Sequence, residues 1–226
     1  MFPQANTAQS VYATDIDGDG DMDVLSAAFL DDTNIAWYAN DGIGNFSEQH
    51  IISTQANLAQ SIYATDLDGD MDVLSAAITN NDIAWYANDG IGNFPEQHVI
   101  SNQGNSVTSI YATDIDGDGD MDVLSTSRND AKIAWYANDG AGNFSEQKII
   151  STQANGAISV YATDIDGDGD MDVLSASADD DKIAWYENLS QTTSINELTV
   201  YQEITISPNP FNDFITIERV SYTENG

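Results

Sequence analysis

The chain contains no cysteine and only five lysines and arginines among its 226 residues. Without cysteine, disulfide bonds, thiol catalysis and cysteine-based zinc sites are excluded. The formal net charge is −33, so the chain is poorly suited to bind nucleic acid or an anionic membrane surface, because both need Lys and Arg. No apolar run reaches the roughly 18 residues of a transmembrane helix. The length and the 41% content of hydrophobic residues nevertheless suffice for a folded core.

Aspartate is what the chain has in excess. Half of the 38 acids, 19 aspartates, fall in four short stretches, which are Asp15–Asp23, Asp66–Asp72, Asp114–Asp122 and Asp164–Asp172. Like charges this close repel, and at an effective dielectric constant near 20 each pair about 4 Å apart costs roughly 4 kcal/mol. We therefore expect these stretches to bind a cation in the folded protein.

The acidic stretches belong to an internal repeat. The phrase that begins at Ser10 returns at Ser61, Ser109 and Ser159. A second phrase, Ile-Ala-Trp-Tyr, is centred on Trp37, Trp85, Trp135 and Trp185, with spacings of 48, 50 and 50 residues. The second unit departs from the others because it lacks a Gly-Asp pair inside its acidic stretch.

Each unit shows the alternation of four short strands, near residues 10–14, 22–28, 34–39 and 46–53 in the first. We predict an all-β fold, a β-propeller-type array of four four-stranded blades near 10–53, 61–101, 109–151 and 159–190, followed by a short β segment. The fourth unit lacks its own fourth strand, and Glu197–Ile204 is the candidate substitute. Whether four blades close a ring stays open.

The acidic stretches have the composition of a calcium loop. In the first, Asp15 to Asp23 places an aspartate at every second position, and Gly18 and Gly20 permit a tight curl. Calcium accepts six to eight oxygen ligands with tolerant geometry, magnesium demands a stricter octahedron, and zinc would need the His or Cys that are absent nearby. An EF-hand is excluded because its twelfth position, normally Glu, is Ser26. The Gly-Gly-x-Gly-x-Asp register of RTX repeats is also missing.

The pattern Asp-x-Asp-Gly-Asp-Gly-x-x-Asp between two strands, with the later turn Gly42–Phe46, resembles the FG-GAP/VCBS repeat of integrin-α-type β-propellers. The resemblance covers roughly residues 4–190, and we assign residues 1–190 to four such repeats. It implies calcium binding through side chains at positions 1, 3, 5 and 9 and the backbone carbonyl at position 7. The implied side-chain ligands are Asp15, Asp17, Asp19 and Asp23, then Asp114, Asp116, Asp118 and Asp122, then Asp164, Asp166, Asp168 and Asp172. The implied carbonyl ligands are Asp21, Asp120 and Asp170, whose carboxylates we expect to face solvent.

The second stretch, with Asp66, Asp68, Asp70 and Asp72, is two residues shorter. Its ninth position is Leu74 unless Asp72 takes that place. We therefore expect three calcium sites and a fourth that is weak or empty, with the calcium structural rather than catalytic.

Other polar and aromatic residues favour no catalytic site. His50 and His98 occupy a repeat position where the third unit has Lys148, which is typical of an exposed strand site. The four repeated tryptophans fit packing between blades better than stacking on sugar rings. Arg128, Lys132 and Lys182 lie in or beside the variable loop between the second and third strands, where we expect a ligand surface.

The repeat breaks after residue 190. Residues 191–203 have the composition of a linker. Residues 204–226, with Ser207-Pro208-Asn209-Pro210 before an alternating strand, resemble the start of a C-terminal sorting domain of the Bacteroidota type IX secretion system, and an ordinary proline turn and hairpin is the alternative. Met1 begins in mid-repeat without a signal peptide, so we expect a fragment of a longer protein.

Three functions are open at this point. The first is a non-enzymatic, calcium-binding extracellular module, secreted or at the cell surface, for adhesion to a carbohydrate or protein. The alternative is an accessory or catalytic propeller of a secreted polysaccharide-degrading enzyme. The third is a spacer in a cell-surface protein with no ligand of its own. No nucleic acid or membrane span is expected, and the secretion machinery is a partner through the C-terminal segment.

Overall fold

A computed structural model of the chain describes residues 7–29, 35–46, 49–79, 81–189, 204–205 and 216–222. Within these residues the fold is all-β, as the alternating pattern predicts, and the strands form four separate sheets in the order of the repeats. No helix long and apolar enough to cross a membrane occurs in the described part of the chain.

Each repeat folds as one sheet, called a blade below. Blade one contains β1 (Ala8–Thr14), β2 (Asp23–Ala28), β3 (Ile35–Tyr38) and β4 (His50–Ser53). Blade two contains β5 (Ala59–Asp66), β6 (Met71–Ala77), β7 (Asp82–Ala87) and β8 (Glu96–Ser101). Blade three contains β9 (Val107–Thr113), β10 (Asp122–Ser127), β11 (Lys132–Tyr136) and β12 (Lys148–Ser151). Blade four contains β13 (Ala157–Thr163), β14 (Asp172–Ser177) and β15 (Lys182–Asn188), extended by β17 (Thr216–Tyr222) and β16 (Ile204–Thr205).

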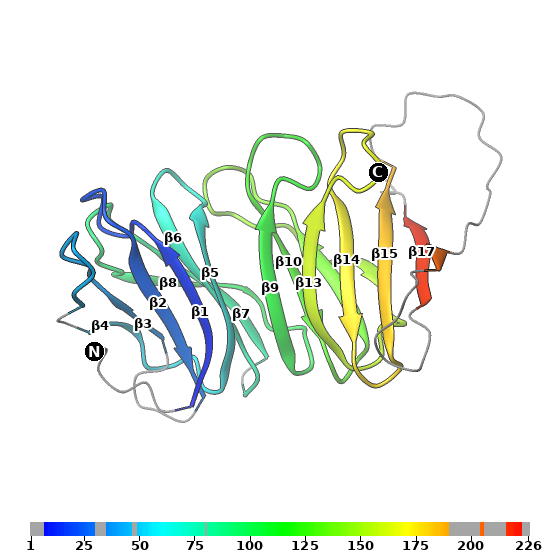
Figure 1. The fold of residues 1–226 in the computed structure, drawn as a ribbon, viewed down its shortest axis with the longest axis horizontal. Helices are drawn as coiled ribbons and strands as arrows, with labels where there is room; N and C mark the ends of the chain where they lie inside the picture. Colours follow the sequence, from blue (N-terminus) through cyan, green and yellow to red (C-terminus); the bar gives the residue numbers. More distant parts are fainter. Residues whose placement is uncertain are drawn as a thin grey trace.

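The four blades form an open array. The first strands of successive blades, β1, β5, β9 and β13, pack side by side in the middle of the molecule, whereas β4 and β17 lie at its opposite ends (Figure 1). Blade one and blade four therefore each have one neighbouring blade in the described structure. Within the described residues, the four blades do not close a ring on themselves.

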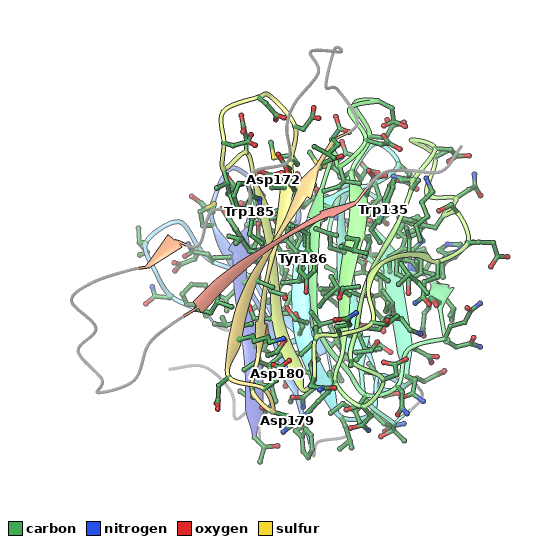
Figure 2. The ribbon with its side chains drawn as sticks, turned by 90° about the vertical axis from the view of Figure 1, so that its right-hand side faces the viewer. Trp135, Asp172, Asp179, Asp180, Trp185 and Tyr186 are labelled. Carbon is green, nitrogen blue, oxygen red and sulfur yellow. The ribbon has the colours of Figure 1, made fainter. Side chains whose placement is uncertain are left out.

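The fourth blade is completed by a strand from far along the chain. β17 pairs with β15 in parallel, from Ile183 opposite Ile217 to Asn188 opposite Tyr222. In the other three blades the fourth strand is antiparallel to the third. The expectation that Glu197–Ile204 supplies this strand is wrong, because β17 occupies the edge of β15 (Figure 2). The predicted linker 191–203 and the Ser207–Pro210 motif lie outside the described residues.

The apolar core lies between blades rather than within one blade. One side of each blade, its leading face, packs against the trailing face of the next. The leading face of blade one consists of Ile16, Leu25, Ala27, Ile35 and Trp37, and the trailing face of blade two contains Ala59, Ile62, Ala64, Val73 and Tyr86. The same repeat positions meet between blades two and three and between blades three and four. The propeller-type packing thus follows from identical apolar patterns in successive repeats.

The repeated tryptophans belong to this core. Trp37, Trp85, Trp135 and Trp185 are each between 3% and 6% exposed. Gly92 and Gly142, both with a left-handed backbone, lie so close to Trp37 and Trp85 of the preceding blade that a Cβ atom would overlap the indole ring. Packing between blades, rather than stacking on sugar, is therefore the role of Trp37, Trp85 and Trp135, each of which lies in a cluster with the next blade.

Polar contacts also join the blades. Asn88 Nδ2 donates to the carbonyl oxygen of Ile16 at 2.8 Å, and Asn138 and Asn188 make the same bond to Leu67 and Ile115. Each of these bonds ties the end of one third strand to the acidic loop of the preceding blade. The acidic loops are consequently part of the interface between blades.

Candidate metal centre

The four acidic loops connect the first and second strands of each blade and lie along one edge of the array, the upper edge in Figure 1. In blade four, Asp172 lies near this edge, while Asp179 and Asp180 lie at the opposite end of the sheet (Figure 2). The strand-loop-strand arrangement that the sequence indicates is therefore present in all four repeats.

The first aspartate of each loop folds the loop around itself. In loop three, the N–H groups of Gly117 and Gly119 donate to the two carboxylate oxygens of Asp114 at 2.7 and 3.0 Å. Asp15 and Asp164 accept the equivalent pairs of glycine bonds in loops one and four. The glycines are needed at these places because their φ angles are positive, between 76° and 100° in the three long loops.

The last aspartate of each loop is a buried structural acceptor. Asp122 is 0% exposed, and its two oxygens accept the N–H groups of Ile115 at 3.0 Å and Asn138 at 2.8 Å. Asp23, Asp72 and Asp172 make the same two bonds in their own blades. These carboxylates join the acidic loop to the end of the third strand, a role that sequence reasoning missed although the aspartate recurs in all four units.

The electrostatic environment of these buried acids is unfavourable to their charge. Burial, reinforced by neighbouring loop aspartates, raises the pKa of Asp72 and of Asp122 to about 7, although backbone hydrogen bonds oppose the shift. Burial likewise raises the pKa of Asp23 and Asp172. A bound cation would stabilise the ionised carboxylates.

Three of the loops bring carboxylates together at the spacing of a metal site. Within the described residues, one oxygen from each of three aspartates lies within 4.8 Å of the others in loops one, three and four; the groups are Asp15, Asp17 and Asp19, then Asp114, Asp116 and Asp122, then Asp164, Asp166 and Asp172. Oxygens that share one calcium ion at about 2.3–2.6 Å can be at most about 5 Å apart. An all-carboxylate donor set of this size fits calcium better than zinc or copper.

Loop two differs from the other three. No group of three metal-competent side chains lies within 4.8 Å in this loop, all of whose residues are described. Asp66 accepts the N–H of Gly69 at 2.6 Å, but the second glycine that the other loops use is deleted from the sequence. Asp72 takes the buried position of the last loop aspartate, while Leu74 is a core residue with 0% exposure. Of the two possibilities that the sequence left open, the structure therefore selects Asp72.

The aspartates at the predicted carbonyl position do not share one environment. The carboxylates of Asp21 and Asp120 lie against Gly42 and Gly140 of the Gly-x-Gly turn in their own blades. Asp170 is only 4% exposed. The expectation that its carboxylate faces solvent is wrong. The sequence could not show this burial because Asp170 has the same neighbours along the chain as Asp120.

The remaining candidate residues are engaged in structural contacts. His50 and His98 stack on Trp37 and Trp85 with ring centroids 4.5 and 4.6 Å apart, and Lys148 Nζ lies 4.1 Å from the centre of the Trp135 ring. The side chain at this repeat position therefore covers the ring of the tryptophan in its own blade. Both a flat imidazole and a cationic ammonium group can make this contact. Among the cations of the variable loops, Arg128 pairs with Asp179 of blade four, Lys132 with Asp130 and Lys182 with Asp180.

Three equivalent grooves, which sequence reasoning did not reveal, lie where the fourth strand of one blade meets the next blade. Each has a volume of about 280–300 Å³. Their walls include an Ile-Ser-Thr/Asn-Gln segment of the fourth strand and the core tyrosine of the next blade, for example Gln103 and Tyr136. The opposite wall differs: Phe94–Gln97 and Phe144–Gln147 line two of the grooves, whereas Ser177, Lys182 and Ala184 line the groove against blade four.

Comparison with known proteins agrees with the repeat and the fold. The model of the FG-GAP-like repeat matches residues 15–71, 66–125 and 114–175, so that each match runs from one acidic loop into the next. No curated protein matches the chain. Among solved structures, the chain is similar to an Agrocybe aegerita lectin whose structure concerns specific recognition of non-reducing terminal N-acetylglucosamine, with a TM-score of 0.54 and 17% identity. The similarity covers 72% of this chain and 45% of that lectin, and at this identity it shows the fold alone.

Proposed function

This chain belongs to the FG-GAP-like repeat family, and from this premise we propose that it is a calcium-stabilised, extracellular module that binds a carbohydrate or protein ligand without catalysing a reaction. One observation carries the proposal: three of the four loops each gather three aspartate oxygens within 4.8 Å, from positions 1, 3 and 5 in loop one and from positions 1, 3 and 9 in loops three and four. Asp15, Asp114 and Asp164 orient each of these loops, and their neighbours supply the other oxygens. The ion would supply positive charge that offsets the repulsion among the carboxylates.

Calcium is expected to bind at three sites and to stabilise the fold. A site with a dissociation constant near 10⁻⁴ M, typical of extracellular modules, contributes about 1.4 kcal/mol at millimolar calcium. Isothermal titration calorimetry should therefore count three sites, and the melting temperature should rise by several degrees between chelator and calcium. An unchanged melting temperature together with no binding heat would contradict the proposal.

Two variants at the same repeat position test which loops contribute to the number of calcium sites. Asp114→Asn should reduce the number of sites from three to two, because it weakens the first ligand of loop three. Asp66→Asn, at the same position of loop two, should leave three sites. Four sites in the unmodified protein would show that loop two binds calcium despite its missing Gly-Asp pair.

The ligand surface is the second part of the proposal. The three equivalent grooves support it, because repeated weak sites gain avidity for a repetitive ligand such as a glycan chain. A glycan array probed in millimolar calcium should show binding that chelator abolishes. Turnover of an acidic polysaccharide in lyase or hydrolase assays would instead favour the alternative, a polysaccharide-degrading enzyme.

Delivery by type IX secretion is proposed from the Ser207–Pro210 motif alone, and fusion of residues 204–226 to a periplasmic reporter would test it.

A further inference from the structure

A row of tyrosines runs across the first strands of the four blades. Each first strand carries a tyrosine at the same repeat position, and these are Tyr12 in β1, Tyr63 in β5, Tyr111 in β9 and Tyr161 in β13. Their ring centroids are 4.8, 5.2 and 4.8 Å apart in that order, and neighbouring rings are tilted by 48–58°. Because these strands lie side by side in the middle of the array, the row crosses all three interfaces between blades (Figure 1).

Hydrogen bonds between the first strands hold the tyrosines in register. Three backbone N–H groups of these strands donate to a serine hydroxyl of the preceding blade at 3.3–3.4 Å. The donors are Ile62, Ile110 and Val160, and the acceptors are Ser10, Ser61 and Ser109. Each of these serines lies two residues before the tyrosine of its own strand, so both side chains are on one face of the strand. The backbone therefore sets the spacing between the rings.

The hydroxyl groups of the row contact one another. Burial, followed by hydrogen bonding with the Tyr12 hydroxyl, raises the pKa of Tyr63. Burial, followed by hydrogen bonding with the Tyr161 hydroxyl, raises the pKa of Tyr111. Both side chains therefore remain neutral phenols. Contact between two phenol hydroxyls also brings together the ring carbons that flank them, which are called the ortho carbons.

The row differs from the other tyrosines whose side chains are described. Those four are core residues that are only 1–2% exposed, and they are Tyr38, Tyr86, Tyr136 and Tyr186. Their hydroxyls contact serine or glutamine side chains rather than another phenol. Tyr12, Tyr63 and Tyr111 are only partly buried, so a small molecule in solvent can reach them. The row thus combines paired rings with access from solvent.

We propose that the tyrosine row is a site of oxidative cross-linking, at which neighbouring rings are joined as dityrosine and successive blades become covalently linked. A diffusible one-electron oxidant takes one electron from each of two neighbouring phenols, and each phenol releases its hydroxyl proton. The two radicals form one carbon–carbon bond between ortho carbons, and the hydrogen on each joined carbon moves to its ring oxygen. The two electrons cleave the O–O bond of a peroxide, the final oxidant. In a chain without cysteine, this bond ties blades together where a disulfide cannot.

Oxidation of the whole chain by a small photosensitiser tests the proposal. A ruthenium tris-bipyridyl complex with light and peroxydisulfate is used at micromolar protein, which limits links between molecules. Dityrosine fluorescence should develop on chains that keep the mass of the 24.4 kDa monomer. Peptide mass mapping should show joined peptides that contain neighbouring tyrosines of the row and lack two hydrogen atoms. Absence of dityrosine, or links that mainly join other tyrosines, would overturn the proposal.

A double variant removes the two central phenols of the row. Tyr63→Phe combined with Tyr111→Phe keeps the packed rings but leaves Tyr12 and Tyr161 without a phenol in the neighbouring blade. Nearly all dityrosine within single chains should be lost. Tyr86→Phe, which removes a phenol from the core instead, is the matched control and should leave the yield unchanged. Melting curves before oxidation confirm that the variants fold. A yield that persists in the double variant, or an equal loss in Tyr86→Phe, would refute the row as the site.

The cross-link should also stabilise the fold. Joining Tyr12 to Tyr63 closes a loop of about 50 residues, which restricts the unfolded chain and should raise the melting temperature by about 10 °C. The double variant, exposed to the same oxidant, controls for damage at other side chains and should show no rise. An unchanged melting temperature in the linked protein would contradict cross-linking in the native arrangement of the blades.

Discussion

Replacing Asp72 by alanine is expected to lower the free energy of unfolding by about 4 kcal/mol, the largest effect that we predict for a single substitution. The carboxylate is buried, with 0% exposure, and accepts the N–H groups of Leu67 at 3.1 Å and Asn88 at 2.9 Å. Alanine would leave both buried donors without an acceptor, at roughly 1–3 kcal/mol each. Urea unfolding in the presence of chelator measures this loss without a contribution from calcium.

The choice of loop two makes this test specific for the hydrogen bonds. Loop two lacks the cluster of three carboxylates that the other loops present, so Asp72→Ala should lower stability without changing the number of calcium ions bound. Asp70→Ala, in the same loop at an exposed position, is the matched control and should change stability by no more than about 0.5 kcal/mol. A loss below about 1 kcal/mol in Asp72→Ala would show that water replaces the carboxylate.

Replacing Gly142 by alanine is expected to cost about 3 kcal/mol. Its φ angle of +72° lies in the left-handed region, which costs an alanine roughly 1–2 kcal/mol. The new Cβ would also overlap the indole ring of Trp85 in the preceding blade, and overpacking in a core costs about 1–3 kcal/mol more. Thermal or urea unfolding of the Gly142→Ala variant measures the sum of both effects.

Gly44 provides the control for this substitution. It has the same repeat position in blade one and a φ angle of +85°, but no described atom lies within 4 Å of an added Cβ. Gly44→Ala should therefore show the backbone cost alone, and the difference between the two variants measures the contact between blades. Equal losses in the two variants would mean that Trp85 moves aside without cost and that the interface between blades is loosely packed.

The sequence predicts which oxygens converge within an acidic loop better than it predicts the contacts between the loop and other strands. The alternation of Asp with Gly in Asp15–Asp23 is local information, because a loop of nine residues determines which oxygens converge. The clustering of oxygens in three loops and its absence from the shortened loop agree with that pattern. The dual bonds of Asp122 are different, because one of them comes from Asn138, at the end of the third strand.

The edge of blade four shows the same limit on a larger scale. Turn residues predict a hairpin between neighbouring strands, and this prediction is confirmed for the antiparallel third and fourth strands of the first three blades. A parallel strand needs no such turn, so nothing near Lys182–Asn188 indicates that Thr216–Tyr222 pairs with it. Proximity in the chain favours the nearer segment, Glu197–Ile204, but parallel pairing does not require proximity.

By itself, the sequence determined the number of repeats, their strands, the all-β class and the loops that gather carboxylates, because periodicity and spacing act over a few residues. Only the tertiary structure decided which of those equal repeats is covered. Val11 and Ile62 occupy the same place in the same pattern, yet one is 70% and the other 4% exposed. Burial is a property of the neighbouring blade, and a repeat cannot encode whether it has a neighbour.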